Sequence, residues 1–252
     1  MTPFVSEKSI VREIWGNGDT ILLIFAGAAA EFALNKAVDW LYFTGRLPAD
    51  PLGRLFSTVG YARRIVFSDT EEAHKAIDTV RAIHGAVEEK RGAVIPDWAY
   101  RDVLFMLVHY SIASFEVLER KLTMAEKDEV CKVFFRVGHR MGIKDLPTDY
   151  KSWLIMHGEH QENDLIKSEH TLDLYKQYRK HLGTVRYKIL LEGQKLVVPP
   201  RVNDLLNLGK PTYITPLLYG YKLSRRVKLD EVFKAIILPP KYKKEIRSLD
   251  RR

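Results

Sequence analysis

The chain has 252 residues, of which 46% are hydrophobic and 29% are charged, a composition typical of a globular protein with room for one large buried core. Its only cysteine, Cys131, excludes an internal disulfide framework and any multi-cysteine zinc or iron–sulfur site. The formal net charge is +8, and residues 222–252 carry eleven Lys and Arg against four Asp and Glu, so most of that excess lies at the end of the chain.

The N-terminal region is apolar without the pattern of a targeting segment. Residues 1–15 lack a basic region followed by an apolar one, which is the pattern of a secretory signal. The longest apolar stretch, residues 21–30, is shorter than the roughly 20 residues that a membrane-spanning helix needs. We therefore expect a buried core helix here and a cytoplasmic protein.

Helical signals dominate the first half of the chain. A first helix is predicted from Asp19 to about residue 43, and a second begins at Asp50-Pro51 and ends near residue 68. A third helix is predicted from Asp69, with acidic residues in its first turn, basic residues in its last turn and Gly92 after it.

The pattern continues through the middle of the chain and weakens after Gly183. A fourth helix is predicted from residue 97, and the Thr123–Glu126 capping box predicts a fifth that Gly142 closes. Two more follow at residues 150–162 and 168–182. After Gly183 repeated prolines predict irregular structure, with a short extended piece at 195–198. The sequence thus predicts an all-α protein, with a core at 1–183 and an irregular C-terminal extension, 184–252, packed on the same domain.

The basic end of this extension, residues 222–252, has three interpretations. It could serve as solubilising charge, contact an anionic membrane surface at its periphery, or bind nucleic acid. No motif typical of nucleic-acid binding accompanies it. We therefore expect no nucleic-acid partner, and the first two interpretations stay open.

Two histidines lie on predicted apolar helix faces. His84 lies on or beside a stripe of apolar residues that recur at helical spacing on the third helix, and His109 follows the apolar run 104–108 of the fourth. A histidine that faces a core is either a hydrogen-bonded structural residue or a ligand to a group bound inside. Helical position alone favours the structural interpretation for both.

Other catalytic and metal motifs are weak. His157 and His160 lie three residues apart with Glu159 and Glu162 nearby, so they could share a metal, although such pairs are common on solvated helices. A carboxylate-bridged di-iron site needs two Glu-x-x-His motifs, and the sequence offers one. The HExxH, GxSxG, Walker and GxGxxG motifs are absent.

One pair of polar residues on the second helix fits an anionic ligand. Arg54 and Thr58 are four residues apart and therefore share a helix face. A guanidinium and a hydroxyl there suit a carboxylate or a propionate, because the Arg fork can bind both oxygens. An intramolecular salt bridge is the alternative.

The order of these motifs along the chain indicates a family to which the sequence is related. The stretch DPLGRLFSTVGYARRIVFSDTEEAHKAIDTVRAIHGAV resembles the signature region of the MpaB-type oxygenases, the family that includes the latex-clearing rubber oxygenases. The resemblance covers roughly residues 8–182. Its matching positions, in chain order, are Asp50, Pro51, Arg54, Thr58, Tyr61, His84, Tyr100, Asp102, His109, Ser114 and Phe115.

The resemblance implies a helical fold around haem b, with His84 as the axial ligand of the iron. It also implies that Arg54 and Thr58 hold a propionate, and that His109 lies near the haem pocket. The partners would then be O2 and a small apolar organic substrate, for example one that contains an alkene. Rubber oxygenases can place a lysine on the distal side of the iron, where this sequence has Ser57. Because a hydroxyl is a poor ligand for haem iron, we expect an open or water-filled distal position.

Three functions remain open at this level. The first is a haem-b-dependent oxygenase. The second is a haem-binding or sensor protein without turnover, and the third is a helical scaffold that docks on a membrane surface through its basic end.

Overall fold

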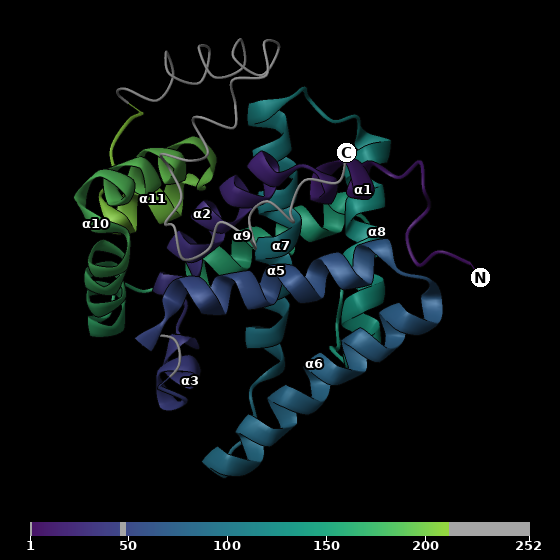
Figure 1. The fold of residues 1–252 in the computed structure, drawn as a ribbon, viewed down its shortest axis with the longest axis horizontal. Helices are drawn as coiled ribbons and strands as arrows, with labels where there is room; N and C mark the ends of the chain where they lie inside the picture. Colours follow the sequence, from purple (N-terminus) through teal and green to yellow (C-terminus); the bar gives the residue numbers. More distant parts are fainter. Residues whose placement is uncertain (1, 46–48, 212–252) are drawn as a thin grey trace.

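The structure, a computed structural model, describes residues 2–45 and 49–211, and these residues contain helices and no β-strand. The expectation of an all-α protein is therefore confirmed for this part of the chain (Figure 1). The helices are α1 (Ile10–Gly16), α2 (Gly18–Leu34), α3 (Val38–Phe43), α5 (Pro51–Phe67), α6 (Thr70–Arg91), α7 (Asp97–Leu118), α8 (Met124–Met141), α9 (Tyr150–Asn163), α10 (Glu169–Val197) and α11 (Pro200–Leu206).

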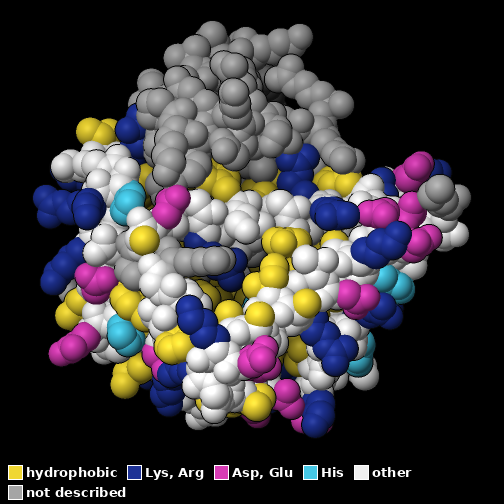
Figure 2. Space-filling view, turned by 60° about the horizontal axis from the view of Figure 1, so that its bottom comes forward, with side chains coloured by type: hydrophobic (Ala, Val, Ile, Leu, Met, Phe, Trp, Pro, Cys, Tyr) yellow, Lys and Arg dark blue, Asp and Glu magenta, His cyan; other side chains and the backbone are white. Residues whose placement is uncertain are grey.

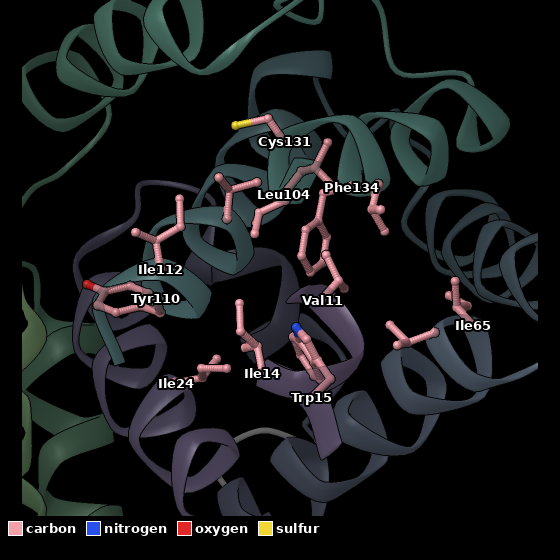
Figure 3. Close-up of a cluster of buried hydrophobic side chains, with 14 of the residues drawn as sticks. Val11, Ile14, Trp15, Ile24, Ile65, Leu104, Tyr110, Ile112, Cys131 and Phe134 are labelled. Carbon is pink, nitrogen blue, oxygen red and sulfur yellow. The ribbon is translucent and has the colours of Figure 1, made fainter. Parts of the chain in front are cut away.

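Helices α2 and α7 pack against each other at the centre, and the others surround them. Helix α10 packs on α2, and α8 packs on α7. Helices α5 and α6 form a V that is joined at one end and opens toward the other (Figure 1). The core between these elements is apolar, and Trp15 is fully buried in it next to the ring of Phe134 (Figure 3). Its indole N–H donates to the hydroxyl of Ser111 at 3.1 Å, which satisfies the one polar group of that side chain.

The capping contacts confirm three of the predicted helix starts. The carboxylate of Asp50 accepts from the backbone N–H of Gly53 at 3.0 Å, and that of Asp69 accepts from Glu72 at 2.9 Å. The capping box of Thr123 and Glu126 is formed in both directions. These contacts satisfy N–H groups that have no partner within the first turn of a helix.

In the structure, the predicted first helix is divided into α2 and α3. Helix α2 begins at Gly18 with Asn17 as its cap, rather than at Asp19, and it stops at Leu34. Asn35 has extended backbone, and its side-chain oxygen accepts from the N–H of Ala37 at 2.8 Å. Its amide nitrogen donates to Asp102 on α7 at 2.9 Å. A buried tertiary contact therefore ends α2, and the sequence pattern gave no sign of it.

Within the extension that was expected to be irregular, residues 184–197 and 200–206 are helical, and residues 212–252 lie outside the described part. Helix α10 continues through a kink at Gly183, where φ is 73° and ψ is 169°, a conformation that essentially only glycine adopts. The predicted extended piece at 195–198 is wrong, because residues up to Val197 belong to α10. The side chain of Gln194 is fully buried and donates to the carbonyl of Ala26 at 3.1 Å. Packing on α2 thus stabilises the second half of α10.

No single helix within the described residues is long and apolar enough to cross a membrane. Helices α1 and α2 together meet the requirements of length and composition, but they are bent by 86° relative to each other. Most of their apolar side chains are buried in the core. The basic end of the chain, residues 222–252, lies outside the described residues.

Candidate active site

A cavity of about 1250 Å³ lies among α2, α5, α6, α7 and α10. It exceeds the roughly 300–1,000 Å³ that is usual for small-molecule sites. Its wall is mainly apolar, with contributions from α2 (Leu22, Leu23, Phe32), α6 (Val80, Val87) and α7 (Val103, Leu104, Leu107). In the face of Figure 2, hydrophobic side chains gather toward the middle with Lys and Arg distributed among them. The cavity therefore suits an apolar ligand that is larger than a typical small substrate.

The apolar stripe of α6 has two parts with different environments. Ala73, Ala76 and Ile77 are fully buried in the core. Further along the same stripe, Ile83 is 39% exposed and lines the cavity. The stripe therefore packs the core at one end of the helix and forms a binding surface at the other, which helical periodicity cannot distinguish.

His84 lies on the cavity-lining part of this helix. Its ring centre is 5.2 Å from that of Tyr100 on α7, and both rings line the cavity. The Nδ1 atom is buried and makes no hydrogen bond with any residue in the described part of the chain. Buried polar atoms in folded proteins nearly always have a partner, so this nitrogen needs one that the described residues do not supply.

The surroundings of His84 favour its neutral form. Burial, and then the guanidinium of Arg54, lower the pKa of this histidine below its usual value. A neutral imidazole keeps the lone pair that binds a metal, whereas an imidazolium has lost it. At neutral pH His84 is therefore available as a metal ligand.

Arg54 and Thr58 line the same cavity as His84, from α5. Arg54 is close enough for its charge to affect the pKa of His84. The Thr58 hydroxyl donates to the backbone carbonyl of Arg54 at 3.2 Å, so it contributes to the wall while its proton is engaged within the helix. The structure thus brings three of the four predicted site residues to one cavity. Ser57 is exposed and also lines it.

His109, the fourth predicted residue, has a different environment. It is not among the described residues that line the cavity. Its Nε2 atom is 3.1 Å from the carbonyl oxygen of Val197, and its ring stacks on that of His157 at 5.0 Å between centres. Burial lowers the pKa of His109 to about 4. It lies on the face of α7 that packs against α9 and the end of α10, away from the cavity-lining face.

A buried polar cluster accompanies His109 on this face, and the sequence indicated only part of it. His157 and His160 on α9 are each 4% exposed, so of the two alternatives for this pair the solvated helix does not hold. The fully buried carboxylate of Glu31 is 2.9 Å from His160 Nε2 and accepts from the hydroxyl of Tyr110 at 2.7 Å. Two sequence signals pointed to this cluster: the spacing of His157 and His160, and the charged Glu31 directly after the apolar run 21–30.

The site and the fold together define a class: an all-α protein with a large apolar cavity, a neutral histidine and an arginine on its wall. The sequence profile described as the ER-bound oxygenase mpaB/B′/Rubber oxygenase catalytic domain matches residues 13–216. The chain belongs to this family, and membership implies an oxygenase of the MpaB and rubber oxygenase type. No curated protein was found to match the chain.

Proposed function

We propose that this protein is a haem-b-dependent oxygenase that acts with O2 on a small apolar organic substrate, one that could contain an alkene. The observation that carries the proposal is the position of His84, a histidine with a lowered pKa, beside Arg54 in the wall of a mainly apolar cavity. Family membership supports the oxygenase part of the proposal. The haem and the substrate are what the resemblance to this family implies, and the residues of the cavity support them.

These residues fit a haem. The cavity is large enough for a flat macrocycle together with a substrate, and its apolar wall matches the faces of a porphyrin. His84 would bind the iron through its imidazole, and its lowered pKa keeps that ring neutral. The guanidinium of Arg54 would pair with a propionate, as a fork that suits a carboxylate. When bound, haem supplies the binding and activation of O2.

The remaining residues of the cavity hold the substrate and exclude water. Side chains from α2, α7 and α10 offer no strong hydrogen-bond partner to a polar ligand over most of the wall. Burial of apolar surface would therefore drive binding, at about 25 cal/mol per Å² removed from water. Ser57 lines the cavity at the position where rubber oxygenases can carry a lysine. This difference favours an open position for O2 and argues against assuming the rubber oxygenase substrate.

Haem binding is tested by reconstitution of the purified chain and by its absorption spectrum. We expect one haem b per chain, with a Soret band that titrates to one equivalent. His84→Ala should remove the signature of histidine ligation, whereas His109→Ala should preserve it. His139→Ala, which changes an exposed histidine of α8, is the matched control. Circular dichroism establishes that each variant is folded.

Three outcomes contradict parts of the proposal. A folded wild-type chain that gives no Soret band excludes the haem. A folded His84→Ala variant with an unchanged spectrum, beside a His109→Ala variant that loses it, reverses the ligand assignment. A haem-loaded chain that consumes no O2 with a panel of alkenes favours the alternative of a haem-binding or sensor protein without turnover.

A further inference from the structure

The buried polar cluster, on the face of α7 that packs against α9, contains three side chains that could share a cation. They are Asp102 on α7, His160 on α9 and Asp164, which caps the end of α9. One ligand atom from each lies within 4.8 Å of the other two. Asp102 and His160 are buried, and the side chain of Asp164 is 23% exposed. This arrangement lies apart from the cavity, because none of the three residues lines it.

The two ring nitrogens of His160 have different surroundings. Nε2 is 2.9 Å from Oε1 of Glu31 and can donate to it. Nδ1 is 2.9 Å from Oδ1 of Asp102, an ion-pair distance although the contact is poorly aligned for a hydrogen bond, and 3.7 Å from Oδ2 of Asp164. The side chain of His160 is only 2% exposed, so this nitrogen is shielded from bulk solvent. The nitrogen is thus directed at two carboxylates, in an arrangement that a cation could share.

These separations match the spacing of ligands around a metal ion. Nitrogen and carboxylate ligands bind Zn²⁺ at about 2.0–2.2 Å, so two ligands of one ion lie roughly 2.8–3.6 Å apart at bond angles from 90° to 109°. The distance from Nδ1 to Asp102 falls in this range, and the distance to Asp164 is slightly above it. The two carboxylates lie within 4.8 Å of each other, so the partly exposed side chain of Asp164 would move closer to complete the set.

Each buried ligand is also held by a second group. Nε2 is engaged with the carboxylate of Glu31. Burial lowers the pKa of His160, but Asp102 and Glu31 together raise it to about 9, so a cation would bind Nδ1 in place of a proton. The side-chain amide of Asn35 donates to Oδ2 of Asp102 at 2.9 Å, so Oδ1 stays available. Such outer contacts are typical of metal-binding histidines and carboxylates, because they set the orientation of the ligand and its tautomer.

The charges of the cluster favour a cation. Glu31, Asp102 and Asp164 are three carboxyl groups around the single imidazole of His160, and the charge of Lys36 acts on Asp164. Burial and the charge of Asp102 raise the pKa of Asp164, and His160 and Lys36 offset part of that rise. Buried carboxylates are costly unless they are paired or bind a metal.

We propose that Asp102, His160 and Asp164 bind one divalent first-row transition-metal ion, with water in its remaining positions. One imidazole and two carboxylates suit Zn²⁺ or Mn²⁺. Because the ligands come from α7, α9 and the end of α9, the ion would fasten α9 to the central helix pair. Its function would be structural, and it is independent of the proposed haem.

Metal binding is measured by titration calorimetry on the tag-free, chelator-treated full-length chain, with ZnCl₂ and MnCl₂ as separate ligands. We expect one equivalent of at least one ion to bind, and an increase in melting temperature with that ion. Asp102→Asn and Asp164→Asn should each weaken binding at least tenfold, because the amide removes the ligand charge while it preserves the shape. Glu162→Gln, an exposed change one residue before the end of α9, should bind like the wild type.

The outcomes separate this site from the cavity. Binding that persists in His84→Ala and is lost in Asp164→Asn supports the proposal. Binding that is lost only in His84→Ala assigns the ion to the cavity and overturns the proposal. No binding to a folded wild-type chain, or equal binding to all four variants, also overturns it. Haem content is measured in parallel, since it should not change in Asp164→Asn.

Discussion

The ring of Tyr110 on α7 lies directly on Gly27 of α2, so closely that a Cβ atom added at residue 27 would overlap its ring carbons. Gly27 and Tyr110 are both buried, and the Tyr110 hydroxyl is fixed by its bond to Glu31. The ring therefore has little freedom to move aside. Contact at this glycine sets how closely the two central helices approach.

We expect Gly27→Ala to lower the free energy of unfolding by about 1–3 kcal/mol, the usual cost of overpacking a core. The matched control is Gly60→Ala on α5, where an added Cβ meets nothing within 4 Å. This exposed change should stabilise the helix by up to about 1 kcal/mol. Denaturant unfolding of both variants measures the difference, and an equal free energy of unfolding in the two would contradict the close packing.

Arg54→Ala should weaken haem retention more than Arg63→Ala. Arg54 lines the cavity, whereas the guanidinium of Arg63 lies over the ring of Phe67, 5.7 Å from its centre. A hydrogen bond to a charged group contributes about 1.5–3 kcal/mol, which corresponds to a loss of roughly tenfold or more in affinity. The ratio of haem to protein after gel filtration measures retention. Equal ratios in the two variants remove Arg54 from the proposed site.

Cys131 should be unreactive in the folded protein. It is fully buried on α8, and burial, then Asp128 and Asp149, raise the pKa of its thiol from 9.0 to about 12. Three pKa units correspond to about a thousandfold less thiolate, the form that reacts with alkylating reagents and aromatic disulfides. The native chain should therefore react slowly at pH 8 and rapidly in denaturant. Because this is the only cysteine, fast labelling of the native chain would place it at the surface.

The basic end of the chain gives a prediction about membranes. Residues 222–252 carry a net charge of +7, and we propose that they contact an anionic membrane surface. Deletion of residues 241–252 should weaken binding to anionic vesicles at low salt, where the attraction is least screened. Haem content should stay the same. A full-length chain that fails to co-sediment with anionic vesicles at low ionic strength would leave this segment with a solubilising role only.

The sequence by itself determined the local elements of this protein. Caps such as Asp69 and Thr123 act within one turn of a helix, so their pattern placed the helix starts correctly. The spacing of Arg54 and Thr58 put them on one helix face, and the order of motifs indicated the oxygenase family that the profile match confirms. Each of these features depends on residues that are close in the chain.

Only the tertiary structure decided which apolar faces meet each other and which surround a cavity. Periodicity gave His84 and His109 the same surroundings, but packing put His84 on a cavity wall and His109 beside α9. It also ended α2 at Asn35 and buried His160 against Glu31, which lies 129 residues earlier in the chain. The physical reason is that burial and charge pairing depend on the distance between residues in space, and a helical pattern defines a face without specifying its partner.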